Sequence, residues 1–222
     1  MSSTIHQDVL PQLADISIEP DRPLIITDAD EVLFNFMEGL EIFLEQEGMY
    51  FDWSSFALTG NIRNQSDRQP VEAKLIPKLI DLFFAEHCHK LPAAPGAAEH
   101  LKKLSQDVQI IVLSNVPPKY AHRRREALKN NNMDFPLIAN IGSKGQVVRH
   151  LTEHLNSPAF FIDDIPTNHS SVSKHANQVH RLHFIADKRL AKMLGPAEHS
   201  HARLDTWPDL HDYIQAVLKK GS

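Results

Sequence analysis

Two aspartates end an apolar run near the start of the chain, at a spacing that could support chemistry. The run LIIT is followed by Asp28 and Asp30 in the stretch from Leu24 to Phe34. Side chains two residues apart in an extended chain lie on the same side of the backbone. Two neighbouring carboxylates repel one another unless positive charge lies close by. The spacing therefore indicates a site for a cation at the end of a buried strand.

Two later segments repeat this design of an apolar run followed at once by polar side chains. QIIVLSNVPP carries Ser114 and Asn115 after its run, and AFFIDDIPTN carries Asp163 and Asp164. Short runs rich in Ile, Val and Phe, separated by helical patterns, are typical of buried parallel strands. The ligand crevice of an open α/β sheet lies outside the carboxyl ends of its strands. We therefore expect these side chains to gather with the two N-terminal aspartates.

A calcium loop of the EF-hand type is the competing interpretation of DADEVLFNFMEG. Such a loop needs Gly at its sixth position and Glu at its twelfth. This segment has Leu33 and Gly39 there. The EF-hand interpretation is excluded.

The motifs, taken in chain order, resemble those of the haloacid dehalogenase (HAD) superfamily, whose members are mostly phosphohydrolases. DADEVL resembles the first motif, Ser114 with Asn115 the second, Lys144 the third and FIDDIPTN the fourth. APGAAEHLKKL is similar to the family's first core helix. The resemblance covers nearly the whole chain and implies an α/β fold with a Rossmann-like parallel sheet flanked by helices. It also implies a small α-helical cap at residues 36–92, inserted into a core of residues 1–35 and 93–222.

The resemblance implies a role for each polar side chain. Asp28 is expected to attack phosphorus and form an aspartyl phosphate, while Asp30 acts first as acid and then as base. Lys144 would place a positive charge against the phosphoryl group. Ser114 and Asn115 would bind the substrate.

A metal ion is implied as well. Ionised acids facing a phosphate need positive charge, and Mg²⁺ prefers hard oxygen ligands of this kind. The expected metal residues are Asp28, Asp30, Asp163 and Asp164. Asp164 is expected to contact the metal with Asp163 in support, and Asp30 to contribute its backbone carbonyl.

The chain departs from the family pattern at two positions. Glu31 stands where most members have Gly, and is expected to bring a negative charge close to the phosphate pocket unless it faces solvent or a basic group. Gly145 stands where Pro is common. We therefore expect the start of the helix after Lys144 to be less fixed, and residues 141–145 to be mobile.

Hydrophobic periodicity predicts the remaining elements. The cap is expected to hold helices at Phe36–Glu47 and Val71–His89 with no strand between them. The core elements expected after the cap are a helix from Pro95, a strand from Gln109, a helix over Pro118–Asn130, a strand at Leu137–Ile141, a helix after Lys144, and then, beyond the fourth motif, a strand at Val179–Ile185 and a helix over Pro208–Leu218.

Substrate specificity is expected to lie in the cap, in the polar stretch LTGNIRNQSDRQ. Arginine suits a second carboxylate or phosphate. We therefore predict that Arg63 binds a distal anionic group of the substrate. The alternative is a solvated loop between the two cap helices.

Composition limits the class of protein. A chain of 222 residues can bury a substantial core and a small second module. One cysteine, Cys88, excludes an internal disulfide and is typical of a reducing compartment, so we expect a cytoplasmic protein without a signal or membrane-spanning segment.

A net charge of −5 disfavours nucleic-acid binding, and the RRR run at residues 123–125 is interpreted as a solvated helix face. The 14 histidines show no recognisable ligand set.

Three classes of function agree with these residues. The favoured class is Mg²⁺-dependent hydrolysis of a small phosphorylated metabolite. A 2-haloacid dehalogenase shares the fold and nucleophile but uses no metal and needs no acid at Asp30. A non-catalytic binding or regulatory protein is the third class, which Glu31 alone supports.

Overall fold

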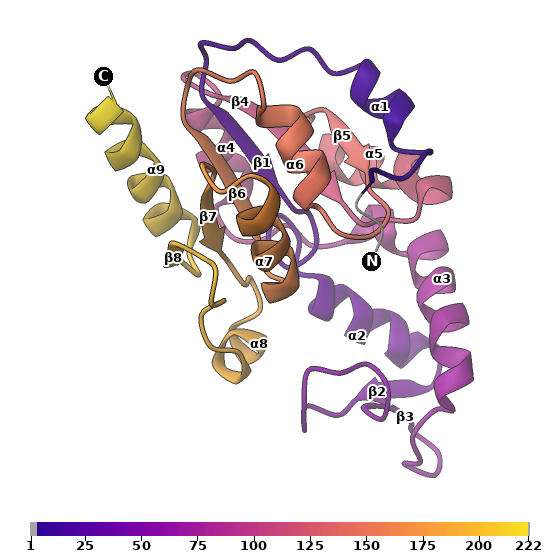
Figure 1. The fold of residues 1–222 in the computed structure, drawn as a ribbon. Helices are drawn as coiled ribbons and strands as arrows, with labels where there is room; N and C mark the ends of the chain where they lie inside the picture. The colour runs from indigo at the N-terminus through magenta and orange to yellow at the C-terminus, as the bar shows by residue number, and fades with distance from the viewer. Residues whose placement is uncertain (1–3, 222) are drawn as a thin grey trace.

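The chain folds around one parallel sheet. The computed structural model describes residues 4–221, shown in Figure 1. Six parallel strands among these residues form the sheet: β1 (Leu24–Thr27), β4 (Gln109–Ser114), β5 (Leu137–Ala139), β6 (Ala159–Asp163), β7 (His180–His183) and β8 (Ala202–Arg203). Their spatial order is β5-β4-β1-β6-β7-β8, so β1 lies between β4 and β6.

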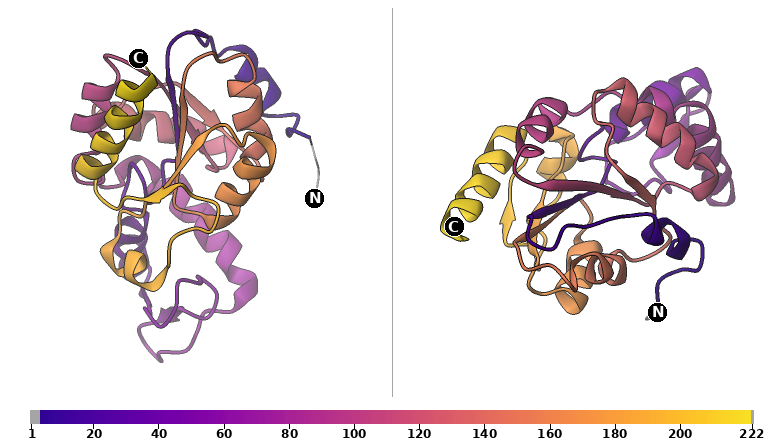
Figure 2. Two further views of the ribbon diagram at one scale, coloured as in Figure 1. Left: turned by 60° about the vertical axis from the view of Figure 1, so that its left-hand side comes forward. Right: turned by 90° about the horizontal axis from the view of Figure 1, so that it is seen from above.

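Helices cover both faces of the sheet, as the two views of Figure 2 show. One face carries α4 (Ala97–Leu104), α5 (Ala121–Asn130) and α9 (Trp207–Gly221), and the other carries α1 (Leu10–Ala14), α6 (Gly145–Thr152) and α7 (Pro166–His175). Alternate residues of β1 are buried on opposite sides, because Ile25 packs with one helix layer and Leu24 and Ile26 with the other. Strands buried on both faces explain the nearly continuous apolar runs of the sequence.

The predicted α/β class is confirmed, with additions at the sheet edge. Neither β8 nor α8 (Lys188–Met193) was expected from the sequence. No helix among residues 4–221 combines the length and apolar character that crossing a bilayer requires.

The segment between β1 and α4 holds helices and a short hairpin, below the sheet in Figure 1. Its elements are α2 (Phe36–Gln46), β2 (Met49–Phe51), β3 (Ile62–Asn64), the 3₁₀ turn η1 (Ala73–Leu75), α3 (Ile76–Glu86) and the 3₁₀ turn η2 (Cys88–Lys90). β2 and β3 pair in antiparallel fashion, so the expectation that no strand interrupts this segment is wrong. Strands of three residues are too short to show an alternating pattern. The cap boundaries at 36 and 92 stay a prediction.

Ion pairs connect this segment to the core. Arg189 of α8 contacts Glu41 of α2 (Nη2–Oε2 2.6 Å), and its guanidinium carbon lies 4.0 Å from the centre of the Trp53 ring. The Trp53 indole N–H donates to the same glutamate at 2.7 Å. Lys119, in the 3₁₀ turn η3 (Pro118–Tyr120) before α5, pairs with Asp81 of α3 (Nζ–Oδ1 2.6 Å). Because the contacts involve both α2 and α3, both helices of the segment are tied to the core.

Candidate active site

The register of the central strands brings the polar strand ends together. Thr27, the last residue of β1, pairs with Val112 of β4 and Ile162 of β6. The backbone N–H of Asp28 donates to the Ile162 carbonyl at 2.8 Å. Ser114 at the end of β4, Asp163 at the end of β6 and Asp164 directly after it therefore lie at the same edge as the first motif, as predicted.

Lys144 lies between two of these carboxylates. Its ammonium nitrogen is 2.9 Å from Asp28 Oδ1 and 2.7 Å from Asp163 Oδ2, and its side chain is fully buried. Lys144 directly precedes α6, so the prediction of a lysine at a helix N-terminus is confirmed. One buried cation thus bridges the first and fourth motifs.

The electrostatics of the site are dominated by burial. Burial raises the pKa of Asp28 to about 7, although Lys144 acts to lower it. Burial and then Asp163 and Asp28 raise the pKa of Asp164 well above its ordinary value. Burial also opposes the charged form of Lys144, but the two carboxylates outweigh it and hold the lysine pKa above its usual range. The site therefore contains more negative charge than Lys144 alone can offset.

Three carboxylates are placed to share a cation. Oxygens of Asp28, Asp163 and Asp164 lie within 4.8 Å of one another, and all three residues are buried. The Asp30 side chain is not part of this group. A set of carboxylate oxygens with excess negative charge is chemically suited to a hard divalent cation such as Mg²⁺.

The two aspartates of the fourth motif have different surroundings. Asp163 accepts hydrogen bonds from Lys144 and from the Ile165 backbone N–H at 2.8 Å. The side-chain amide nitrogen of Asn168 donates to both of its oxygens, at 3.0 and 3.2 Å. The Asp164 carboxylate accepts no hydrogen bond from any donor within residues 4–221. Asp163 is thus occupied by protein donors, whereas the Asp164 oxygens remain available.

Two buried histidines contact the backbone of these aspartates. His169 Nε2 lies 2.9 Å from the Asp163 carbonyl and His183 Nε2 lies 3.0 Å from the Asp164 carbonyl. His183 Nδ1 accepts from the Ala197 N–H at 3.0 Å, so its Nε2 carries the proton and donates. The sequence offered no signal for this pair, because both contacts depend on the tertiary fold.

Ser114 and Asn115 differ in their contacts. Ser114 Oγ is buried and has no hydrogen-bond partner in the part of the chain that the structure describes. The Asn115 amide donates to the Gly142 carbonyl at 3.1 Å and its oxygen accepts from Asn140 at 2.8 Å. The Ser114 hydroxyl at the end of β4 is therefore unpaired within residues 4–221. Asn115 instead stabilises the loop that leads to Lys144 through its hydrogen bonds with Gly142 and Asn140.

Glu31 neither faces solvent nor pairs with a basic group. It is 3% exposed, and its two oxygens accept the backbone N–H groups of Met37 (2.7 Å) and Asp187 (2.8 Å). Its backbone has φ of 55°, in the left-handed region that favours glycine. The carboxylate instead stabilises this turn by joining it to the first turn of α2 and to the loop after β7. Burial raises the Glu31 pKa to about 7.

Gly145 permits close packing of α6 on α7. A Cβ at this position would collide with the backbone carbonyl of Ser171 in α7. The glycine therefore lets the two helices approach closely behind Lys144. The expected mobility of residues 141–145 stays a prediction.

We expect Gly145→Ala to lower the free energy of unfolding by about 1–3 kcal/mol, as overpacking against rigid backbone does. Turnover should fall with it, because Lys144 is the adjacent residue. Urea unfolding monitored by circular dichroism measures the first effect. Gly195→Ala is the matched control, since a Cβ there meets open space. Equal stability of the two variants would contradict this account of Gly145.

Arg63 lies in the hairpin and contacts other residues of the same segment. Its Nε is 2.9 Å from Asp52 Oδ2, and its Nη1 donates to the Arg68 carbonyl at 3.1 Å. The structure does not bring Arg63 into the carboxylate cluster. Its role in substrate binding stays a prediction.

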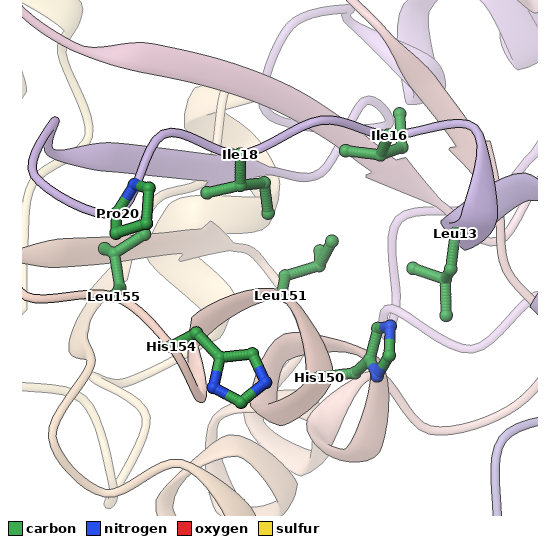
Figure 3. Close-up of a pocket in the computed structure, with 8 residues that line it drawn as sticks. All are labelled: Leu13, Ile16, Ile18, Pro20, His150, Leu151, His154 and Leu155. Carbon is green, nitrogen blue, oxygen red and sulfur yellow. The ribbon is translucent and has the colours of Figure 1, made fainter.

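An apolar hollow of about 160 Å³ lies elsewhere, between the N-terminal segment and α6, and is shown in Figure 3. It is lined by Leu13, Ile16, Ile18, Pro20, His150, Leu151, His154 and Leu155. It shares no residue with the carboxylate cluster, so it is not the candidate active site.

Solved structures share this architecture. A haloacid dehalogenase-like family hydrolase from Streptococcus pneumoniae has a TM-score of 0.57 at 14% identity, over 88% of this chain and 99% of that one. A HAD family hydrolase from Deinococcus radiodurans, with bound phosphate and sodium, has a TM-score of 0.55 at 16% identity, over 90% and 97%. CbbY from Rhodobacter sphaeroides, in complex with phosphate, has a TM-score of 0.56 at 14% identity, over 85% and 96%.

No family model matches the sequence, and no curated protein matches it. The structural likeness alone defines the class, which is the haloacid dehalogenase fold. The resemblance that the motifs indicated is confirmed at the level of that fold.

Proposed function

We propose that the protein is a Mg²⁺-dependent phosphohydrolase that acts on a small phosphomonoester through an aspartyl-phosphate intermediate. The observation that carries this proposal is the buried Lys144 between Asp28 and Asp163, at the sheet edge where the neighbouring strand β4 ends in Ser114. A carboxylate nucleophile, a fixed cation and a free hydroxyl at one strand edge form a receptor for a phosphoryl group.

Asp28 is the nucleophile in this proposal. Its Oδ1 accepts from Lys144 and from the Ala29 N–H at 2.7 Å, which orients the carboxylate. The bond from the carboxylate to phosphorus forms as the bond from phosphorus to the leaving oxygen breaks. Water then attacks phosphorus, releases phosphate and restores Asp28. Lys144 and the Ser114 hydroxyl stabilise the negative charge on the phosphoryl oxygens.

Asp30 provides the acid and base in this proposal. It gives a proton to the leaving oxygen in the first step and takes one from the attacking water in the second. It follows Asp28 by two residues, and its side chain is not in the group of clustered carboxylates that would hold the cation.

Mg²⁺ would be bound by Asp28 and Asp164, with the Asp30 carbonyl as a further oxygen and Asp163 in support. The Asp164 carboxylate accepts no hydrogen bond within residues 4–221, which fits a direct metal ligand. The Asp163 carboxylate already accepts several hydrogen bonds from the protein, which fits a supporting role. When bound, the cation would neutralise phosphate charge in the reaction.

Hydrolysis of a panel of phosphomonoesters tests the proposal. The panel includes an activated aryl phosphate and is measured with Mg²⁺, with chelator, and with Asp28→Asn as the control protein. We expect turnover that requires the metal and is lost in the variant. Turnover of 2-haloacids that persists in chelator would instead indicate the dehalogenase class. A wild-type protein inactive on every ester would favour the binding or regulatory class.

A further inference from the structure

Arg124 is buried next to the proposed acid–base residue. It lies in the middle of α5, is 0% exposed, and its Nη2 is 2.5 Å from Asp30 Oδ1. The neighbouring Arg123 is half-buried and Arg125 is exposed. The interpretation of the RRR run as a solvated face is therefore wrong for its central residue.

The remaining polar atoms of Arg124 are not used by the fold. Its Nε and Nη1 are buried and have no hydrogen-bond partner within residues 4–221. Its guanidinium carbon lies 5.1 Å from the centre of the Phe34 ring, an apolar neighbour that supplies only a cation–π contact. Burial opposes the charged guanidinium, but Asp30, together with Cys88 and Asp28, outweighs burial and holds the Arg124 pKa above its ordinary value.

Apolar side chains in place of both Arg124 and Asp30 would stabilise the fold about as well as this ion pair does. Replacing a buried ion pair by packed apolar residues is often neutral or stabilising, because charges lose hydration on burial. Arg124 also leaves two donors unsatisfied, which costs further free energy. Packing alone does not account for an arginine here, so we consider what it does to Asp30.

Asp30 is the more exposed partner of this ion pair. Its side chain is 23% exposed, whereas that of Arg124 is fully enclosed. A fixed guanidinium bound to Oδ1 limits the rotation of the carboxylate. This contact leaves Asp30 Oδ2 as the oxygen that can give a proton to the leaving oxygen and then accept one from the attacking water.

We propose that Arg124 is a positioning residue that fixes the Asp30 carboxylate for general acid–base catalysis. This inference rests on the proposed phosphohydrolase function. Arg124 itself transfers no proton. It acts through Asp30, so its loss should matter most for substrates whose leaving oxygen needs a proton.

The test compares leaving groups in Arg124→Met, which keeps the length and apolar bulk of the side chain and removes the charge. The probes are 4-nitrophenyl phosphate, whose leaving group departs without a proton, and an alkyl phosphate from the panel. We measure kcat/KM, which reports the step that releases the leaving group. General acid catalysis contributes roughly 10²–10⁴-fold, so we expect the alkyl ester to lose about tenfold or more beyond any loss with the aryl ester.

Asp30→Asn and the double variant complete the experiment. Asp30→Asn should show the same preference for the aryl ester, and adding Arg124→Met to it should cause little further loss, because both changes remove one function. Arg125→Met, an exposed arginine of the same helix, should leave both esters unchanged. Arg124→Lys retains the charge and replaces the methionine variant in the experiment if that variant does not fold. We expect it to show a smaller extra loss of kcat/KM for the alkyl ester relative to the aryl ester.

The outcomes are distinguishable. An equal loss for both esters, or none, in the Arg124 variants would overturn this inference while the phosphohydrolase function stands. Absence of metal-dependent turnover in the wild type would overturn the function and this inference with it.

Discussion

Lys144→Met is expected to destabilise the fold by about 3–5 kcal/mol at pH 8 and to lower turnover by about 10²–10³-fold. Methionine approximates the shape of lysine, so the change removes charge more than volume. Asp28 and Asp163 would then share a buried site without their common cation. Leaving buried carboxylates uncompensated is far more costly than removing an exposed pair. Turnover would fall because the phosphoryl group loses the same positive charge.

Urea unfolding at pH 8 and pH 6 measures the effect on stability. The loss should be smaller at pH 6, because a buried carboxylate without its cation can take up a proton. Lys103→Met is the matched control: Lys103 pairs with Glu99 at 2.6 Å, a similar distance, but both side chains are largely exposed. Exposed pairs contribute little, so this variant should unfold almost as the wild type does. A Lys144→Met protein of wild-type stability at pH 8 would show that Lys144 does not balance two ionised carboxylates.

The sequence was sufficient to place the candidate catalytic residues at one edge of a parallel sheet. Each apolar run that ends in Asp28, Ser114 or Asp163 is a buried strand, and neighbouring parallel strands end at the same edge. Local pattern thus determined the position of these side chains, because the strand ends carry them.

The features that the sequence did not reveal depend on contacts between distant residues. Glu31 reaches Asp187 across 156 positions of the chain, and neither residue type predicts the other. A glycine is expected where the backbone is left-handed, so a glutamate that stabilises its turn with two backbone hydrogen bonds has no local signal. Gly145 likewise depends on how α6 packs against α7.

Arg124 shows the same limit within a single helix. Three successive arginines point to different sides of a helix, and the weak apolar pattern of α5 does not indicate which side is buried. Only the position of Asp30, 94 residues earlier, makes the central arginine interpretable.

The metal-free protein is expected to lose about 2 kcal/mol or more of stability as pH rises from 6.5 to 8. In the folded state the pKa values of Asp28 and Glu31 are raised to about 7, from 3.8 and 4.5, and that of Asp164 is raised well above 3.8. Burial is the main cause of all three. A carboxyl group with a raised folded pKa binds more protons in the folded state than in the unfolded one. Its stabilising contribution is complete below the unfolded pKa and is lost as pH rises through the folded value.

The two buried histidines of the site do not reverse this trend. Burial lowers the pKa of His169 from 6.5 to about 4 and also lowers that of His183 from 6.5, so their contributions are lost as pH falls below 6.5. The comparison between pH 6.5 and 8 lies above that range and reports the carboxyl groups. Urea unfolding in the presence of chelator, at several pH values within this window, measures the slope.

Mg²⁺ should oppose the loss, because a cation bound by ionised carboxylates stabilises the folded state most where their protons have left. The increase in melting temperature on adding Mg²⁺ should therefore be larger at pH 8 than at pH 6.5. Calorimetry in buffers of different ionisation enthalpy should detect release of protons on binding.

Glu31→Gln distinguishes the contribution of Glu31 from that of the clustered carboxylates, since Glu31 is outside the cluster. This variant should show a shallower loss of stability with pH but keep the effect of Mg²⁺, whereas Asp164→Asn should lose most of the Mg²⁺ effect. A magnesium effect independent of pH would mean that the cation does not displace protons from these carboxylates.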